Sequence, residues 1–479
     1  MKAGFCEQDI TPLLGMECPG DYQKSFVRAF HDPLKVRAVV LDDGDDRVAL
    51  VGVDTAGMQS QVAVDEVRQR IERGCGILGD HVLVAASHTH SGGPFSGFLA
   101  DTVAEAPPLI RKLALDHSVA ADPGYCEWVK GRIVTAVCEA DRTKQEALLS
   151  VGSGREDQVS FNRRVRMKGG RVYTHPGKGN PDALEYGGPI DPEVGVIGAW
   201  TLEGKLLGCV VNFACHGTTW GGSVSADWVC YLERVIKRVW SERAAVVFLN
   251  GACGDVTQVD NLSPFAERDG EENPRFVGTR VGAEALKVLV SVPRGELTPV
   301  AAVTSRVLCR RRRPGPERLA EATRIVEEGL RVGNTGTTEW LFAKEALVAD
   351  YLVGREPEVE VELQAVQVGP AVFAANPAEL FCQLGLEIKR RSQFPFTYVV
   401  ELANGDVGYV PSEDAFLPSG GGYETVLTSY SNLEVSAGPK IVAAFRELLG
   451  RLEPGAVPQR PPAPPFSGPW SYGTLGPDV

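Results

Sequence analysis

The most informative stretch of the sequence is Val82-Leu83-Val84-Ala85-Ala86-Ser87-His88-Thr89-His90-Ser91-Gly92. Its five apolar residues predict a fully buried strand, and the polar residues and glycine after them predict a turn at the carboxyl end of that strand. Two β-rich runs, residues 36–41 and 47–53, lie upstream on either side of an acidic hairpin, and residues 60–73 carry the apolar spacing of a helix. Strand, helix and strand followed by a polar turn is the order of an α/β protein, in which sites lie at the carboxyl ends of strands.

The remaining chain continues this alternation of apolar strands and helices. Residues 142–200 predict strands that are interrupted by a Gly- and Pro-rich loop at 176–191. Further helices are predicted at 123–141, 231–240, 317–331, 339–352 and 380–390, and further strands at 207–213, 244–249, 363–374 and 398–402. We therefore predict one large α/β catalytic domain of packed mixed β-sheets flanked by helices over residues 1–450, and a Pro- and Gly-rich C-terminal arm over residues 451–479.

The composition excludes several classes of protein. The 479 residues include 49 basic and 62 acidic side chains, which give a net charge of −13. Such a balance argues against a nucleic-acid-binding protein and against a stable membrane anchor. The four arginines at 310–313 lie beside prolines and predict a solvated linker rather than a nucleic-acid patch. We expect a small-molecule substrate, and the sequence leaves open whether the chain forms a homo-oligomer.

The cysteines and the N-terminus indicate a compartment. The eleven cysteines are scattered, form no Cys-x-x-Cys pair and include several in apolar surroundings, such as Cys209 and Cys215. This usage predicts reduced thiols. The first residues do not have the pattern of a secretory signal, so we expect a cytoplasmic protein.

Three of the seven histidines follow apolar strands directly. His88 and His90 lie after the strand at 82–86, and His216 lies after the strand at 207–213. In an extended chain, residues two apart point the same way, so the side chains of His88 and His90 are expected to lie together. Three histidines at strand ends predict a zinc site or a catalytic site. The alternative is a polar strand end that only bonds its own backbone.

Several separated blocks of the sequence resemble the neutral/alkaline non-lysosomal ceramidases and their bacterial relatives, in their catalytic N-terminal domain. The blocks occur in the order of that family between about residues 3 and 435. They are Asp9-Ile10-Thr11-Pro12, His31-Asp32-Pro33-Leu34, His88-Thr89-His90-Ser91-Gly92, Asn162-Arg163, Asn212-Phe213-Ala214-Cys215-His216-Gly217 and Asn250-Gly251-Ala252-Cys253-Gly254-Asp255.

The resemblance implies a single zinc ion and a set of site residues. The implied ligands are His88, His216, Glu379 and Tyr409, in which two imidazoles, a carboxylate and a weak phenolic ligand leave one position open for water. Arg163 and Tyr423 correspond to substrate-contacting positions. His90 and Thr257 correspond to catalytic positions.

One position departs from the pattern of that family. Thr257 stands where the ceramidases carry serine, and Gln258 follows it in place of proline. Because the β-branched threonine fixes χ1, hydrogen bonding near the zinc is expected of it rather than a covalent role.

The implied function is a zinc-dependent amidohydrolase that cleaves the amide of an N-acylated amine or amino alcohol with a zinc-activated water. The loops at 94–99 and 176–189 are expected to narrow the site for a small soluble substrate. Two alternatives stay open. One is a zinc hydrolase of an ester, lactone or sugar derivative, and the other is a catalytically silent relative that binds a metabolite.

Overall fold

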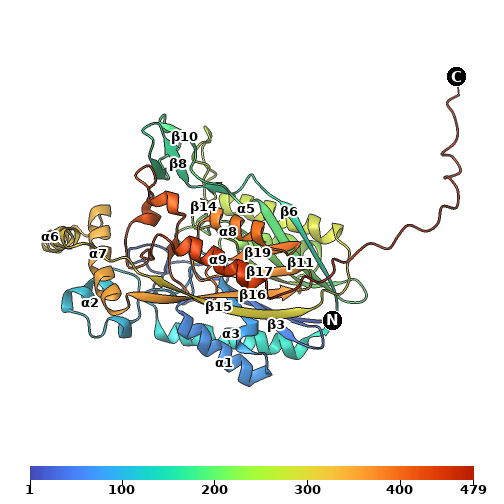
Figure 1. Cartoon of the computed structure of the whole chain (residues 1–479), viewed down its shortest axis with the longest axis horizontal. Helices are drawn as coiled ribbons and strands as arrows, with labels where there is room; N and C mark the ends of the chain where they lie inside the picture. The colour runs from blue at the N-terminus through green and yellow to red at the C-terminus, as the bar shows by residue number, and fades with distance from the viewer. Residues whose placement is uncertain (479) are drawn as a thin grey trace.

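Three main sheets form the centre of the computed structural model, which describes residues 1–478 (Figure 1). The first has the strand order β4-β3-β2-β1-β5 and contains β1 (Lys2–Asp9), β2 (Lys35–Asp42), β3 (Arg47–Val53), β4 (Val82–Ala86) and β5 (Gln145–Glu146). The second has the order β13-β12-β11-β6 and contains β6 (Leu148–Arg155), β11 (Glu193–Trp200), β12 (Leu206–Phe213) and β13 (Ala245–Asn250). The third has the order β15-β16-β17-β19 and contains β15 (Val300–Arg310), β16 (Glu358–Val368), β17 (Ala371–Ala375) and β19 (Phe396–Val400).

Short strands pair outside these sheets. A three-stranded sheet of order β10-β8-β9 consists of β8 (Arg164–Met167), β9 (Val172–Thr174) and β10 (Ala183–Tyr186), and β8 and β10 project from the body at the top of Figure 1. Two further pairs lie near the site described below. They are β7 (Phe161–Asn162) with β14 (Val256–Thr257), and β18 (Glu379–Leu380) with β20 (Tyr409–Val410).

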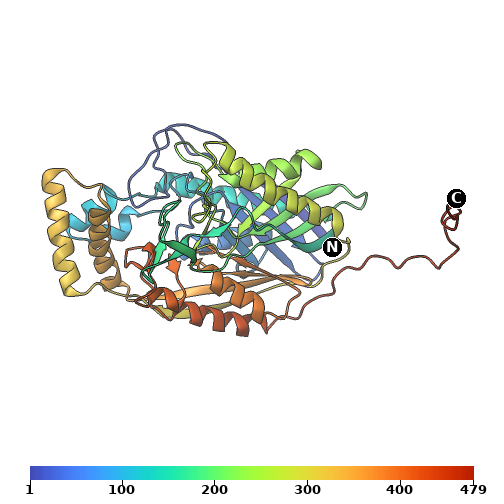
Figure 2. The same cartoon turned by 90° about the horizontal axis from the view of Figure 1, so that it is seen from above.

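The three main sheets share one apolar core. In β2, Val39 and Leu41 face this shared core, whereas Val36, Ala38 and Val40 face outward toward helices. Because both faces of the strand are buried, the run has no polar alternation in its sequence. The outward faces are covered by helices, as Figure 2 shows from above. These are α1 (Gln61–Cys75) and α3 (Pro123–Thr143), α4 (Trp228–Val239) and α5 (Glu272–Ser291), and α8 (Cys382–Arg391) and α9 (Ala437–Leu449).

Three helices form a separate packing unit at one end of the molecule. They are α2 (Pro108–Leu115), α6 (Pro316–Val332) and α7 (Thr338–Arg355). Their apolar side chains pack on one another around Trp340 rather than on the shared core. Because α6 and α7 connect β15 to β16, they form a helical hairpin inserted between two neighbouring antiparallel strands.

Each main sheet contains one parallel pair of neighbouring strands. These pairs are β3 with β4, β12 with β13, and β17 with β19. The carboxyl ends of parallel strands lie at the same edge, where an α/β fold places its sites. This topology explains how the segments after β4, β12 and β17 meet, although they are far apart in the sequence.

The predicted fold class is confirmed, and most predicted elements lie within a few residues of the observed ones. Two predictions were wrong. The loop predicted at 176–191 contains β10, which pairs with β8 across a register shift. Arg311 and Arg312 do not lie in a solvated linker, because both are half-buried and donate hydrogen bonds to the segment at 425–433. After α9, the described residues to 478 contain no helix or strand, and this arm extends away from the body in Figure 1.

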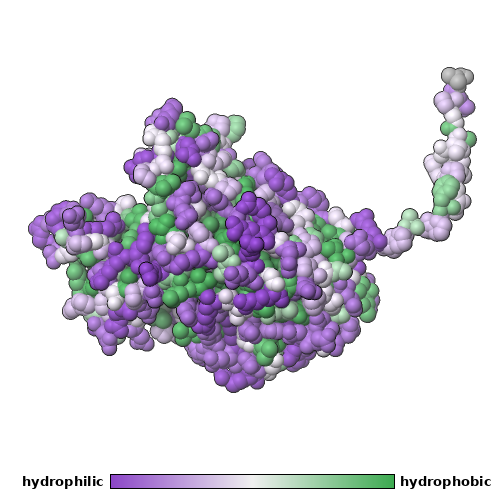
Figure 3. Space-filling view, viewed as in Figure 1, coloured by the Kyte–Doolittle hydropathy of each residue, from purple (hydrophilic) through white to green (hydrophobic). Residues whose placement is uncertain are grey.

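The surface is mostly hydrophilic on the face drawn in Figure 3, with apolar areas that are small and separated. No helix among the described residues is both long and apolar enough to cross a bilayer.

Candidate metal centre

His88 and His90 lie in the loop that follows β4. The chain is not extended there as expected, because His88 has a φ of 64°, in the left-handed region. The two rings nevertheless lie edge to face with centroids 4.7 Å apart. Nδ1 of His88 faces the carbonyl oxygen of Ala56 at 2.5 Å, and Nδ1 of His90 faces that of Gly20 at 2.7 Å. These backbone contacts hold both rings in place.

His216 lies after β12 and is 1% exposed. Its Nδ1 faces the carbonyl oxygen of Val256 at 3.1 Å, and the Cys253 sulfur lies 3.4 Å from the same nitrogen. The indole N–H of Trp228 donates to the carbonyl oxygen of His216 at 3.0 Å. The segment after β13 and the first residue of α4 therefore fix the ring.

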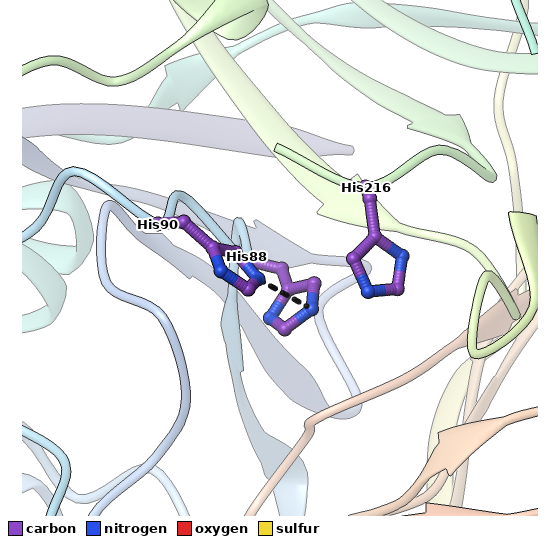
Figure 4. A group of neighbouring side chains, drawn as sticks. All are labelled: His88, His90 and His216. Carbon is purple, nitrogen blue, oxygen red and sulfur yellow. Dashed lines mark hydrogen bonds between the residues drawn. The ribbon is translucent and has the colours of Figure 1, made fainter. Parts of the chain in front are cut away.

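The three imidazoles converge from two loops, as Figure 4 shows. In each ring Nδ1 faces an acceptor on the backbone, so Nδ1 carries the proton and Nε2 is left to bind a cation. The Nε2 atoms of His88 and His90 are 3.3 Å apart, and ligand atoms of all three rings lie within 4.8 Å of one another. Three inward-facing imidazole nitrogens are a frequent arrangement in zinc sites.

Glu379 brings a carboxylate to the same point. It begins β18, which pairs in parallel with β20 so that Glu379 lies opposite Tyr409. Its Oε2 lies 3.3 Å from Nε2 of His88 and 3.2 Å from Nε2 of His216, and it has no hydrogen-bond partner among the described residues. A buried carboxylate oxygen without a partner, facing two imidazole nitrogens, fits a bound cation.

The proton balance of the group supports the same conclusion. Burial lowers the pKa of His88, but the Glu379 carboxylate raises it more, to about 9. Burial and the neighbouring His88 lower the pKa of His90 to about 4. At neutral pH the group therefore holds one proton between His88 and Glu379, which a metal ion would displace on binding.

A second group, His31, Asp32 and Cys230, also lies close together but does not suit a metal. Asp32 already accepts hydrogen bonds from the His31 ring, from the Ser225 hydroxyl and from the Ala226 N–H. Its carboxylate is satisfied by protein groups, so we interpret this cluster as structural.

Arg163 packs behind the histidines. It is 3% exposed, and its Nη1 lies 3.1 Å from Nε2 of His216. Its Nη2 donates to the carbonyl oxygen of Gly254 at 2.7 Å and to the Tyr409 hydroxyl at 3.2 Å, and its Nε donates to Glu424 at 2.8 Å. Burial, followed by the nearby Glu379, holds the pKa of Tyr409 well above its usual value.

The predicted substrate residue Tyr423 joins this arrangement. Its hydroxyl lies 3.1 Å from that of Tyr409, and the Arg163 guanidinium lies 4.9 Å from the centre of its ring. Tyr409 and Tyr423 are therefore brought next to the imidazoles through Arg163, whose other contacts fix its position.

A cavity of about 850 Å³ opens on this group. Its polar end, which we call the metal end, contains His88, His90, Glu379, Tyr409 and Tyr423 on the lining and His216 behind them. Its other side, which we call the apolar wall, consists of Phe98, Val119, Phe342, Leu352 and Val353. A cavity of this size, apolar with a few convergent polar groups, is typical of small-molecule sites.

The loops expected to narrow the site differ in their placement. Ser96, Gly97 and Phe98 line the cavity. Residues 176–189 contribute nothing to its lining within the described chain, because part of this segment pairs with β8 as β10.

Thr257 lies beside the site rather than in it. It is 2% exposed in β14, and its hydroxyl donates to Oε1 of Gln258 at 3.0 Å. The residue before it, Val256, provides the carbonyl that faces His216. The structure therefore brings the backbone of this block to the site and directs the Thr257 side chain toward Gln258.

Several lining residues were not predicted from the sequence. They are Tyr22, Asp406, Tyr430 and the residues of the apolar wall other than Phe98. Asp406 was within reach of sequence reasoning, because it is an acidic residue in the same strand-end loop as Tyr409. The others come from α7 and from loops whose approach depends on tertiary packing.

Comparison with known proteins places this arrangement in a structural class. The fold is an α/β architecture with a histidine-rich site at the carboxyl ends of strands from three sheets. No family model matches the sequence. Two solved structures are similar to it. The neutral ceramidase from Pseudomonas aeruginosa is 19% identical with a TM-score of 0.68, covering 96% of this chain and 76% of that chain.

The second structure, described as a ceramidase complexed with C2, is also 19% identical with a TM-score of 0.68 and covers 97% of this chain and 77% of that chain. The chain therefore has the fold of the neutral ceramidases, and the resemblance found in the sequence is confirmed at the level of the fold.

Proposed function

We propose that the protein is a zinc-dependent hydrolase that cleaves the amide of an N-acylated amine or amino alcohol. The observation that carries the proposal is the convergence of three imidazole Nε2 atoms and the unpartnered Oε2 of Glu379 at one end of a large cavity. The ceramidase fold supports the choice of an amide bond over other bonds.

The ligands we assign are His88, His216, Glu379 and Tyr409. Nε2 of His88 lies 3.3 Å and Nε2 of His216 lies 3.2 Å from Oε2 of Glu379, which is itself the third ligand atom. Tyr409 lies opposite Glu379 in the β18–β20 pair and lines the cavity beside it, and we assign its phenol oxygen as the fourth ligand. A bound zinc ion supplies a Lewis acid for a carbonyl oxygen and lowers the pKa of its water to about 7.

The remaining residues bind the substrate and move protons. His90 lines the cavity, and we assign its Nε2 to accept the proton that the attacking water releases and to deliver it to the leaving nitrogen. Arg163 is buried and does not line the cavity, and we assign it to holding Tyr409 and the backbone at Gly254 in position. Tyr423 lines the cavity and contacts the substrate.

The apolar wall suits the acyl group of such a substrate. Its five side chains offer apolar surface to an acyl chain, and charged side chains from the same part of the chain, such as Glu345 and Arg355, also line the cavity. We also propose a cytoplasmic location, which is supported by the eleven cysteines, all of which are free thiols.

Metal analysis combined with a substrate panel tests the proposal. We expect the purified protein to contain close to one equivalent of zinc and to hydrolyse N-acyl amines or amino alcohols. Treatment with a chelator should abolish hydrolysis, and one equivalent of zinc should restore it. A protein that binds zinc but turns over esters and no amides would contradict the assigned bond, and a protein that hydrolyses amides without metal would contradict the assigned centre.

A further inference from the structure

Asp406 is a carboxylate in the cavity that the proposed reaction does not use. It lies between β19 and β20 and lines the cavity beside Tyr430. Its Oδ1 accepts the N–H of Gly408 at 3.0 Å, which closes the turn before Tyr409. Its Oδ2 has one protein partner, the Tyr430 hydroxyl, at the long distance of 3.4 Å. One oxygen therefore shapes the backbone, and the other is left almost free.

Apart from Glu379, several fully buried carboxylates of the chain are better satisfied. Glu345 pairs with Lys344, and Glu424 pairs with Arg163. Asp227 has no basic partner, but it accepts hydrogen bonds from Thr219, Trp220 and Trp228. Asp406 forms no ion pair with any described residue. Asp406 is half-buried on the lining of the cavity, so its almost unpartnered Oδ2 is left for water or for a ligand.

The surroundings of Asp406 place it close to the metal end. The Tyr430 hydroxyl lies 3.4 Å from Oδ2 of Asp406, and the Tyr430 ring lies 5.7 Å from the ring of Tyr409 at the metal end. On the other side, a Cβ at Gly57 would lie 2.5 Å from Oδ2 of Asp406, so only glycine permits this approach of the backbone. Burial also raises the pKa of Asp406 to about 7.

The two sides of the cavity therefore suit different halves of a substrate. The five residues of the apolar wall offer contact surface to an acyl group, and Ser118 and Glu345 are polar lining residues from the same part of the chain. Asp406 offers an acceptor next to Tyr430 and close to Tyr409 of the metal end, where the amine half of an amide would lie if its carbonyl carbon were at the metal end.

We propose that Oδ2 of Asp406 accepts a hydrogen bond from an O–H or N–H donor on the amine half of the substrate, and that this contact selects substrates carrying such a donor. The inference rests on the proposed amide hydrolysis for the orientation of the substrate. A hydroxyl and an ammonium group share the required chemistry, since both donate to a carboxylate.

Three amides with the same acyl chain test the proposal. They are the N-acyl ethanolamine, the N-acyl ethylenediamine and the N-acyl propylamine, which differ only in a terminal hydroxyl, ammonium or methyl group. We expect kcat/KM to be about 10- to 100-fold higher for at least one donor-bearing amide than for the propylamide. Which of the two is preferred identifies the donor. Equal kcat/KM for all three would overturn the proposal.

Variants of Asp406 provide the second measurement. Asp406→Asn keeps an oxygen for the Gly408 N–H but replaces Oδ2 with an NH₂ group, so the turn is retained and the acceptor is lost. We expect this variant to lose the preference, so that its kcat/KM values for the donor-bearing amide and for the propylamide agree within about threefold. Asp414→Asn, at an exposed position of the same segment, is the matched control and should keep the wild-type preference. An unchanged preference in Asp406→Asn would contradict the proposal.

Binding separates a failure of this inference from a failure of the proposed function. Ketone analogues, in which CH₂ replaces the amide N–H, cannot be hydrolysed, and calorimetry measures their affinity for the zinc-loaded protein directly. We expect the analogue with the donor to bind about 10- to 100-fold more tightly than the methyl analogue, and Asp406→Asn to remove this difference. If the wild type turned over no amide but still bound the donor analogue more tightly, only the proposed reaction would be refuted. If it hydrolysed amides but bound the two analogues equally, only the role of Asp406 would be refuted.

Discussion

The two sides of the cavity are built in different ways. Imidazoles at the metal end follow strands of the first and second sheets, and each ring is held by a backbone carbonyl. The apolar wall comes largely from α7, which packs on its own small cluster around Trp340. Main-chain hydrogen bonds therefore fix the metal end, whereas side-chain packing and a buried ion pair hold the wall. We expect the hydrolytic reaction to depend on the metal end. The stability of the protein and its choice of substrate should depend on the apolar wall.

The largest effect on activity is expected from His88→Ala or His216→Ala. Each variant removes one of the imidazoles that face Oε2 of Glu379. Zinc content should fall to a small fraction of one equivalent, and kcat/KM should fall by at least about 1,000-fold, or about 4 kcal/mol of transition-state stabilisation. Metal analysis and amide hydrolysis measure the two changes.

His117→Gln is the control for these variants, because His117 lies next to Trp340 on the other side of the cavity. It should keep a full equivalent of zinc. If His88→Ala and His216→Ala both retained full metal, the assigned centre would be wrong and the contrast between the two sides would not hold.

A substitution behind the apolar wall should lower the stability of the protein without changing its zinc content. Lys344 of α7 is fully buried and donates to the carbonyl oxygens of Tyr22 and His117 and to the Ser118 hydroxyl, and it pairs with Glu345 at 3.0 Å. Lys344→Met leaves the Glu345 carboxylate buried without its partner. The free energy of unfolding should fall by about 3–5 kcal/mol.

Denaturant unfolding measures this change, and metal analysis should still find one equivalent of zinc. Lys440→Met is the matched control, because its pair with Glu434 is exposed, and it should cost less than about 1 kcal/mol. Loss of zinc from folded Lys344→Met would show that the metal end depends on the wall.

His90→Ala distinguishes a proton carrier from a ligand within the metal end. Because His216 and Glu379 remain, zinc content should stay near one equivalent, while kcat falls by about 100-fold, the scale of a lost general acid or base. Zinc content and kcat, both measured on the same preparation, distinguish a proton carrier from a zinc ligand. Zinc loss as large as that of His88→Ala would make His90 a ligand.

How much of this site is predictable from sequence depends on how local its geometry is. His88, His90 and His216 could be predicted because an apolar strand followed by a polar, glycine-containing turn defines a strand end within ten residues. The left-handed conformation of His88 could not be predicted, since it is set by contacts of the loop with Ala56 and with the segment after β12.

Glu379 and Tyr409 required more than local sequence. They are thirty positions apart and meet because β18 pairs with β20, and only the resemblance to ceramidases linked them to zinc. Phe342 and Leu352 of the wall could be predicted to lie on a helix. Their approach to the histidines depends on how the α6–α7 hairpin folds back from β15 and β16, and no motif records that packing.

Phe342→Ala should change the substrate preference of the wall. Phe342 lines the cavity and its ring lies 5.8 Å from that of Tyr22. Removing the ring enlarges the apolar end, so kcat/KM for acyl chains a few carbons longer should rise relative to shorter chains by about tenfold. A series of amides with increasing acyl length measures the shift, and zinc content should not change. A uniform fall in kcat/KM at every chain length would contradict a selective role for the wall.

The smallest effect is expected at Thr257, and it tests which part of a matched sequence block matters. The block brings the Val256 carbonyl to His216, whereas the Thr257 hydroxyl donates to Gln258. Thr257→Val keeps the branched shape and the β7–β14 pairing but removes the hydroxyl. We expect kcat to fall by less than about tenfold, compared with the ~100-fold or greater cost of losing an oxyanion donor, and Thr257→Ser to be near normal. Steady-state kinetics at full zinc content measures both variants.

A loss of about 100-fold or more in Thr257→Val would mean that the hydroxyl turns toward the substrate during turnover. Mass spectrometry would then show whether Thr257 carries an acyl group. With the hydroxyl directed at Gln258 and the backbone alone in contact with His216, we expect no such adduct.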